Sequence, residues 1–210
     1  MKVRNLDYSS RRIIPLFPSL MYRDDKTKGF DDVKEDLIEY AYKQREEDDI
    51  NQVVSNRGGW QTPTVNTRFF NKESFKPYMS WFGDRIKEYI DHMNFNMSSG
   101  RDIYLASMWF NINGKGHYNA SHNHPNTTVA GVLWIKAPKN CGRFQVEDLN
   151  IAKRHSSPPI ANKNELNMNV AGLEISEGDL LIFPGYLPHK VARNETDDDR
   201  IVISFNVDIK

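Results

Sequence analysis

The pattern of apolar and polar positions changes near Gly100 and predicts different elements on its two sides. After Gly100, short runs of β-branched and aromatic residues alternate with Gly, Asn and Pro, which is the pattern of strands separated by turns. Seven strands are predicted, at 102–112, 128–137, 142–149, 170–176, 179–184, 188–194 and 200–209. Between two of them, 150–169 is expected to be one long polar loop, a type that often serves as a lid or binding loop.

The last predicted strand has one apolar face and one mostly polar face. The apolar face comprises Ile201, Ile203, Phe205 and Val207. The other face comprises Arg200, Val202, Ser204, Asn206 and Asp208. An inner face that carries Arg and Ser is unusual in a strand that ends a β-rich region.

Before Gly100 the pattern predicts helices and one edge strand. Segment 13–22 is apolar but interrupted twice by proline, which suits an edge strand. Helical spacing covers 32–47, with Asp31 or Asp32 available as N-cap. A second helix is expected to be capped by Ser74 and to tolerate Pro77 in its first turn. Its apolar face would comprise Tyr78, Phe82, Tyr89 and Met93.

This order of elements indicates the fold class. Helices gathered before seven strands favour a mainly β protein, a sandwich or jelly roll supported by N-terminal α-helices. We expect a single domain over 1–210, with mixed helical support and edge strands in 1–100 and the jelly-roll core with its functional site in 101–210.

Composition narrows the classes of function. The chain has 210 residues, and its 28 basic and 28 acidic residues give no net charge, which disfavours nucleic acid as a partner. Cys141 is the single cysteine, which excludes an internal disulfide and fits a reducing compartment. No secretory signal and no apolar run of about 18 residues is present, so we expect a cytoplasmic protein without a membrane contact. The oligomeric state, including a homo-oligomer, stays open.

Three histidines form the main chemical candidate. His122 and His124 stand two residues apart in SHNHP, so on a strand both imidazoles would point to one side and could chelate one metal ion. His189 follows much later in FPGYLPHKV. A lone histidine on a strand is usually an ordinary structural residue. The combination of a close pair with a distant third favours a metal site.

The ligand types limit the metal without identifying it. Imidazole suits iron, zinc, copper and nickel, and three ligands on one side with open positions are typical of non-haem Fe(II). A structural zinc would usually require four ligands including cysteine, and Cys141 lies outside the cluster. A catalytic zinc with three histidines stays open, because spacing alone does not separate it from iron.

Arg200 has two interpretations. It follows three aspartates in DDDRIVISFN, so it could form a surface ion pair, which contributes little to stability. Alternatively, its guanidinium lies at a cavity and presents a planar fork that matches a carboxylate. Close to a metal, such an arginine would orient a dicarboxylic acid that also chelates the ion.

From 109 to 206 the chain resembles the 2-oxoglutarate- and Fe(II)-dependent oxygenases, particularly a subgroup common in phages and marine bacteria. The resembling segments are MWFNIN, HNHPNTTVAGVLWI, GDLLIFPGYLPHKV and RIVISFNV. SNRGGWQT at 55–62 looks like the N-terminal signature of the same subgroup.

The resemblance implies a double-stranded β-helix, a cupin-like jelly roll. His122 and His189 would be iron ligands, and Arg200 would bind the distal carboxylate of 2-oxoglutarate. O2 would take a remaining position on Fe(II). The product would be a hydroxylated small molecule or peptide, with release of succinate and CO2. For a viral chain, the expected location becomes the host cytoplasm.

Two positions depart from the family pattern. Position 124 is usually Asp or Glu; here His124 is expected to be the third ligand, which leaves the centre one charge unit more positive. Two residues after the arginine, a serine that helps hold 2-oxoglutarate is common, whereas this chain has Val202, and Ser204 is the candidate substitute. Asn111 and Trp109 either line the pocket, Asn111 as a cofactor contact, or serve only in packing.

Two alternatives keep the jelly roll and change the function. A cupin-like metalloenzyme that does not use 2-oxoglutarate would have no need of Arg200. A non-catalytic binding or structural module, such as a virion component, predicts that the three histidines lie apart in the fold.

Overall fold

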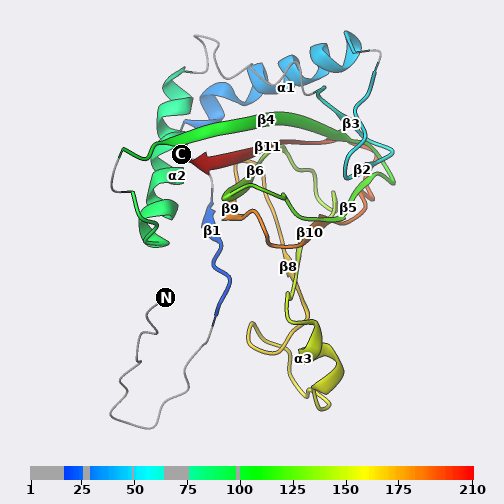
Figure 1. The fold of residues 1–210 in the computed structure, drawn as a ribbon. Helices are drawn as coiled ribbons and strands as arrows, with labels where there is room; N and C mark the ends of the chain where they lie inside the picture. Colours follow the sequence, from blue (N-terminus) through cyan, green and yellow to red (C-terminus); the bar gives the residue numbers. More distant parts are fainter. Residues whose placement is uncertain (1–16, 26–28, 49, 64–75, 98–99) are drawn as a thin grey trace.

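The computed structural model describes residues 17–25, 29–48, 50–63, 76–97 and 100–210, and they build two facing antiparallel sheets (Figure 1). The major sheet has the order β1 (Tyr22–Asp24), β9 (Leu180–Pro184), β6 (Val129–Lys136), β11 (Arg200–Ile209), β4 (Ile103–Asn113) and β3 (Trp60–Gln61). The minor sheet has the order β2 (Asn56–Arg57), β5 (Tyr118–His122), β10 (His189–Val191), β7 (Phe144–Glu147) and β8 (Val170–Leu173).

The winding of the chain is that of a double-stranded β-helix. From β4 to β11 the chain passes to the other sheet at every step except from β7 to β8. The predicted mainly β jelly roll is therefore confirmed. Each of the seven predicted strands exists, several of them shorter than expected. The sequence pattern missed β5, because YNASH is too polar to be recognised as a strand.

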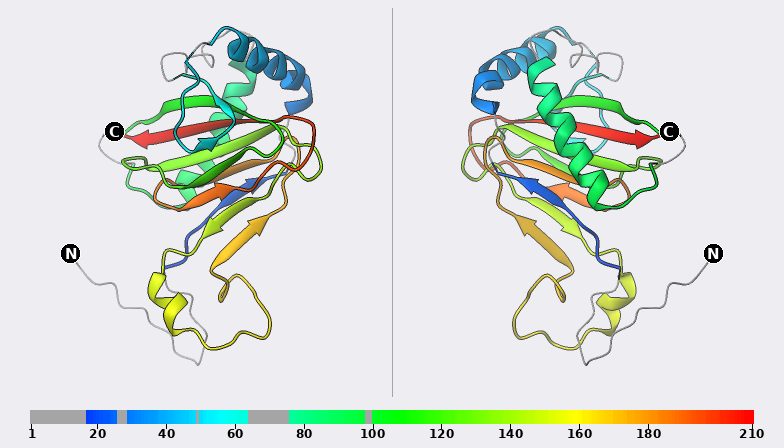
Figure 2. Two further views of the ribbon diagram at one scale, coloured as in Figure 1. Left: turned by 90° about the vertical axis from the view of Figure 1, so that its right-hand side faces the viewer. Right: turned by 90° about the vertical axis from the view of Figure 1, so that its left-hand side faces the viewer.

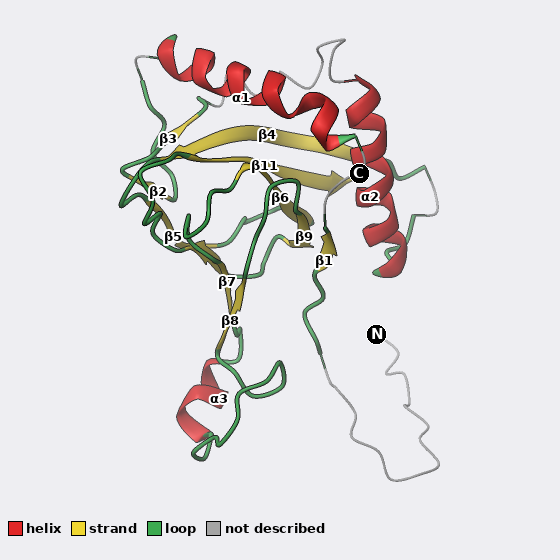
Figure 3. Cartoon of the chain, turned by 180° about the vertical axis from the view of Figure 1, so that it is seen from behind, coloured by secondary structure: helices red, strands yellow, loops and turns green. Residues whose placement is uncertain are grey.

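The major sheet has different cores on its two faces. Its outer face is covered by α1 (Phe30–Glu46) and α2 (Lys76–His92), which lie on the same side of β4 and β11 (Figure 3). The apolar face predicted for the last strand packs in this outer core: Ile201, Ile203, Phe205 and Val207. The inner core between the sheets contains Ala130, Val132, Trp134, Phe144, Leu181, Phe183, Leu187, Val191 and Val202.

The helix boundaries differ in part from the predicted ones. The N-cap of α1 is Gly29 at φ 79, so the expected capping by Asp31 or Asp32 is wrong. Glycine tolerates this left-handed conformation, and it places both aspartates in the first turn, where they complement the helix dipole. Ser74 lies outside the described residues. The apolar face of α2 is confirmed, with Tyr78, Phe82 and Tyr89 buried and Met93 packed against them.

Two further segments differ from the sequence prediction. The expected edge strand at 13–22 is shifted: residues 13–16 lie outside the described residues, 17–21 are not in a strand, and β1 begins at Tyr22. Segment 150–169 is not all loop, because it contains α3 (Ile151–Ser156), and it projects away from the two sheets (Figure 2). Within the described residues, no helix is long and apolar enough to span a membrane.

Gly131 on β6 provides a test of this packing. A Cβ at this position would lie 2.0 Å from Cζ of Phe205 and 2.7 Å from the carbonyl oxygen of Leu181. We expect Gly131→Ala to reduce the free energy of unfolding in urea by about 2 kcal/mol, because the core would be overpacked. Gly172→Ala on β8 is the control, since its Cβ would meet only Arg143 Cδ at 3.7 Å. Equal effects of the two substitutions would contradict the packing described for β6.

Candidate metal centre

The fold brings the three predicted histidines together at one end of the minor sheet. His122 is the last residue of β5 and His189 the first residue of β10, and the two are direct partners in the antiparallel ladder. His124 lies two residues beyond the end of β5, so the expectation that it shares a strand with His122 is wrong. Its backbone N–H donates to the carbonyl of Gly185 at 2.8 Å, which holds it beside the other two.

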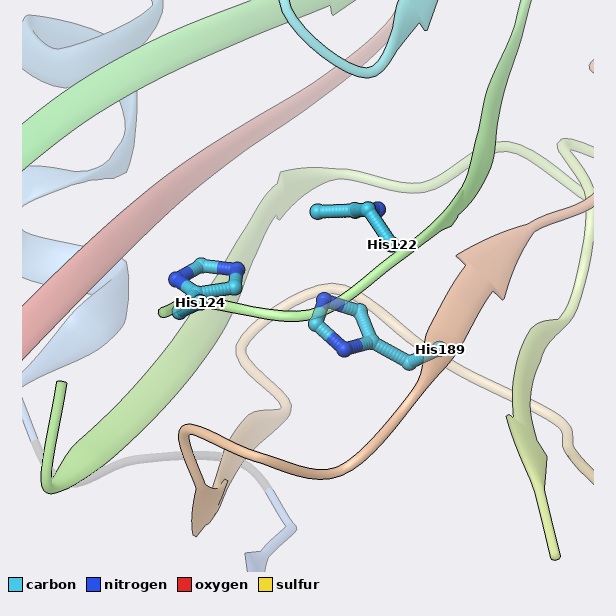
Figure 4. Close-up of side chains that lie close together, drawn as sticks. All are labelled: His122, His124 and His189. Atoms are coloured by element: carbon cyan, nitrogen blue, oxygen red, sulfur yellow. The ribbon is translucent and has the colours of Figure 1, made fainter. Parts of the chain in front are cut away.

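The three side chains point toward one another (Figure 4). Their ligand atoms all lie within 4.8 Å of one another, and the ring centroids are 4.3 to 5.3 Å apart. A metal bound about 2.1 Å from each imidazole nitrogen would draw these atoms closer together, to roughly 3 Å from one another. The prediction of a non-catalytic module, that these histidines lie apart, is wrong.

Hydrogen bonds orient each imidazole. The Nδ1 atom of His122 lies 2.8 Å from the carbonyl oxygen of Ala120, and that of His189 lies 2.9 Å from the carbonyl oxygen of Leu187. The third ring is held differently, because Nδ1 of His124 contacts the side-chain oxygen Oδ1 of Asn206. Each of these acceptors requires a proton on Nδ1, so the lone pair is on Nε2. We therefore expect the Nε2 atoms to be the metal ligands.

Burial keeps the cluster uncharged. Loss of solvation lowers the pKa of His122 and His124, and it lowers the pKa of His189 to about 3. Repulsion from His122 adds to the effect at His189. Metal binding requires the neutral imidazole, so the folded chain presents these side chains in the state that a metal ion needs.

Arg200 lies inside the barrel, fully buried at the start of β11. Its Nη1 donates to the carbonyl oxygens of Cys141 and, at 3.0 Å, Ala192, and its Nη2 donates to Oδ1 of Asn119 at 3.4 Å. Its Nε has no partner among the described residues. Burial lowers the pKa of Arg200 to about 10, which leaves the guanidinium charged at neutral pH.

The surface ion pair considered for Arg200 does not form. The three preceding aspartates face other cations: Asp197 pairs with Lys115, Asp198 with Lys136 and Asp199 with Arg45. Within the described residues, the guanidinium donates only to neutral oxygens. A buried cation without an anion is energetically unfavourable, so this environment favours an anionic ligand.

A hollow of about 420 Å³, open solvent at its mouth included, contains the histidines and reaches Asn119, a contact of Arg200. Its lining includes all three histidines together with Ser55, Trp109, Asn111, Asn119, Val202 and Ser204. Asn119 also contacts Arg200, so one residue links the hollow to the buried cation. Asn111 donates from Nδ2 to Oγ of Ser204 at 3.4 Å, while its Oδ1 has no partner in the described part of the chain. Asn111 and Trp109 therefore do line the pocket.

Three residues of this region were missed by sequence reasoning. Asn206 could have been found, because it shares the polar face of the last strand with Arg200 and Ser204. Asn119 and Ser55 meet in the barrel, where Nδ2 of Asn119 donates to Oγ of Ser55 at 3.4 Å. Ser55 immediately precedes β2 and Asn119 lies on β5. Both segments are short and polar, so no local sequence pattern indicated that they lie close together.

Comparison with known proteins agrees with this architecture. Residues 107–206 match the family described as "Putative 2OG-Fe(II) oxygenase". Among curated proteins, none matches the sequence.

Several solved structures share the fold at low sequence identity. A prolyl-4-hydroxylase from Pseudomonas putida matches with a TM-score of 0.60 and 13% identity, over 89% of this chain and 91% of that one. The viral collagen prolyl hydroxylase of Paramecium Bursaria Chlorella virus-1, in its 2OG complex, gives 0.53 and 13%, over 89% and 94%. HygX from Streptomyces hygroscopicus, with nickel, 2-oxoglutarate and hygromycin B bound, gives 0.56 and 11%, over 89% and 82%.

The family match spans the segment that holds the histidine cluster and Arg200, and the fold is the one that these oxygenases share. Residues 107–206 are therefore similar to the 2-oxoglutarate- and Fe(II)-dependent oxygenases, and the chain shares the fold of solved members of that group.

Proposed function

We propose that this oxygenase hydroxylates a small molecule or peptide, with His122, His124 and His189 as ligands of Fe(II) and Arg200 as the ligand of 2-oxoglutarate. One observation carries the proposal. A buried guanidinium whose recorded partners are all neutral oxygens lies next to a hollow that also contains three neutral imidazoles. A dicarboxylate in this hollow can satisfy the arginine with one end and reach a metal with the other.

The donor set fits Fe(II). Three nitrogen ligands gathered at one side of a hollow leave further metal positions open, which is the arrangement of non-haem iron oxygenases. Cys141 contributes its backbone carbonyl to Arg200, and its thiol is not part of the cluster. When bound, iron supplies the activation of O2 that couples conversion of 2-oxoglutarate into succinate and CO2 to oxidation of a substrate.

We assign the polar residues of the hollow to the two ends of 2-oxoglutarate. Asn119 touches Arg200 and belongs with the distal carboxylate. Ser204 lies four residues along β11 from Arg200, roughly 13 Å at the rise of a strand. We therefore assign Ser204 and its partner Asn111 to the end nearer the histidines. Val202, between them, packs in the inner core and supplies no hydrogen bond.

The substrate is proposed only by class. The structures of similar fold include prolyl hydroxylases, one of them in complex with a peptide fragment, and HygX with hygromycin B bound. We propose a small-molecule or peptide substrate for this chain, in the cytoplasm, and expect no role for nucleic acid.

The co-substrate requirement can be tested without knowing the substrate. Anaerobic addition of Fe(II) and 2-oxoglutarate to the metal-free protein should produce a weak visible charge-transfer band, because the keto acid chelates the ion. In air, the same mixture should slowly form succinate. His122→Ala and His189→Ala should lose both signals. A native protein that gives neither band nor succinate would contradict the proposed activity.

Arg200 should affect the co-substrate and spare the metal. In Arg200→Gln, we expect 2-oxoglutarate to bind about 100-fold more weakly, in line with truncation of one partner of a buried charged pair. Metal affinity, measured by Mn(II) titration, should change by no more than about twofold. Arg193→Gln is the matched control, because this arginine is exposed and donates to the carbonyl of Gly116. Equal loss of metal and co-substrate binding in Arg200→Gln would mean that the assigned role is wrong.

The neutral state of the cluster predicts a pH dependence of stability in the metal-free protein. His189 has an ordinary pKa of about 6.5 when unfolded and about 3 in the fold. Between these values the unfolded chain binds more protons, so stability decreases as the pH falls through this window. From pH 6.5 to 5, this residue alone should remove up to about 2 kcal/mol.

Urea unfolding of the native protein and His189→Gln over this pH range isolates the contribution. The variant cannot be protonated at position 189, so its stability should decline less steeply on acidification. Parallel pH profiles of the two proteins would show that His189 is not held neutral by the fold.

A further inference from the structure

His124 is supported differently from the other two histidines of the cluster. His122 and His189 lie on neighbouring strands, and each Nδ1 contacts a backbone carbonyl two residues earlier in the chain. His124 lies outside any strand, and its Nδ1 contacts a side chain from β11, the amide oxygen of Asn206. The orientation of His124 therefore depends on one side chain that can be replaced.

Asn206 is itself held in place. It lies opposite Ser107 in the β11–β4 ladder, and its Nδ2 donates to Oγ of Ser107 at 3.1 Å. This contact directs the amide nitrogen toward β4 and the amide oxygen toward His124. The ring of Trp109 stacks on His124, with centroids 5.9 Å apart and an angle of 29° between the planes. The hydrogen bond and the stacked ring together restrict rotation of the imidazole.

The chemistry of an amide suits this role. The oxygen of Asn206 can only accept, so the proton of a neutral His124 must be on Nδ1 and its lone pair on Nε2, directed into the cluster. An amide also carries no charge, so the imidazole remains a neutral ligand. At this position a histidine needs such a partner, because nothing else described in the structure contacts its Nδ1.

We propose that Asn206, held by Ser107, is the positioning residue that makes His124 the third metal ligand. This inference rests on the metal site proposed above. It assigns a function to an asparagine on the polar face of β11 and explains how a histidine outside any strand is oriented toward the other two.

The test uses Co(II), whose visible absorption reports on the ligands of the ion. Asn206→Leu keeps the approximate size of the side chain and removes the acceptor, so Co(II) affinity should fall about 10- to 100-fold, as for other residues that orient metal ligands. Asn206→Asp keeps an acceptor and should bind Co(II) within a few fold of the native protein. Asn162→Leu, an exposed site on the β7–β8 connection, is the matched control.

Two further readouts separate positioning from general structural damage. In the metal-free protein, nitrogen NMR of the His124 ring should show the Nδ1–H tautomer, and Asn206→Leu should release the ring to exchange between tautomers. In a double-mutant cycle, Asn206→Leu should cause no further loss of Co(II) affinity once His124 is replaced by alanine. If Asn206→Leu does not fold, Asn206→Ser replaces it in these experiments. The serine hydroxyl is too short to reach the ring, so the same loss of Co(II) affinity is expected.

The outcomes distinguish this inference from the proposed function. Native Co(II) affinity in folded Asn206→Leu, or an undiminished effect in the His124→Ala background, would overturn the role of Asn206 while the metal site stands. Native Co(II) affinity in both His122→Ala and His189→Ala would instead overturn the metal site, and the tautomer measurement would still report on Asn206.

Discussion

The buried charge of Arg200 is the constraint on which the rest of the site depends. A guanidinium with no exposed surface must be stabilised by its surroundings, and here its partners are two backbone carbonyls and the amide oxygen of Asn119. Neutral oxygens compensate only in part for lost hydration, and Nε is left without a partner among the described residues. The fold therefore tolerates an unfavourable interaction that a bound carboxylate would relieve.

Strand β11 links this constraint to the stability of the whole barrel. Its outward residues pack beneath α1 and α2, while on its inward face Ser204 lines the hollow, and Arg200 and Asn206 contact the lining residues Asn119 and His124. Because side chains alternate strictly along a strand, the apolar packing of one face fixes the register of the other. The helices on the outer face thus contribute to the geometry of the site, although none of their residues lines the hollow.

The parts that could be predicted from sequence are those with a strong local signal. The period-two pattern of 200–209 predicted both faces of β11 correctly, and the helical spacing of the N-terminal half predicted both helices and the apolar face of α2. β5 was missed because Asn119 and His122 line the hollow and Ser121 is exposed, so the strand lacks an apolar pattern. Gly29 was missed as a cap because the aspartates that follow it are the commoner capping residues.

In the site too, features with a local sequence signal could be predicted, whereas features that depend on tertiary contacts could not. The histidines could be grouped because their order and spacing are a known pattern, yet the strand argument for His124 failed, since β5 ends before it. The contacts of Arg200 with Asn119, and of His124 with Asn206, join segments more than 80 residues apart. Such contacts depend on the register of strands across a whole sheet, and a short sequence motif does not determine that register.

The charge of the assembled site follows from the replacement at position 124. In the proposed site the three ligands are neutral imidazoles and contribute no negative charge, so a divalent metal and the nearby guanidinium would together carry three positive charges. The two carboxylates of 2-oxoglutarate balance two of them. One positive charge then remains beside a hollow whose polar lining, Ser55, Asn111, Asn119 and Ser204, is uncharged. Coulomb interactions are stronger in a protein interior than in water, so this remaining charge would strengthen binding of the dianion.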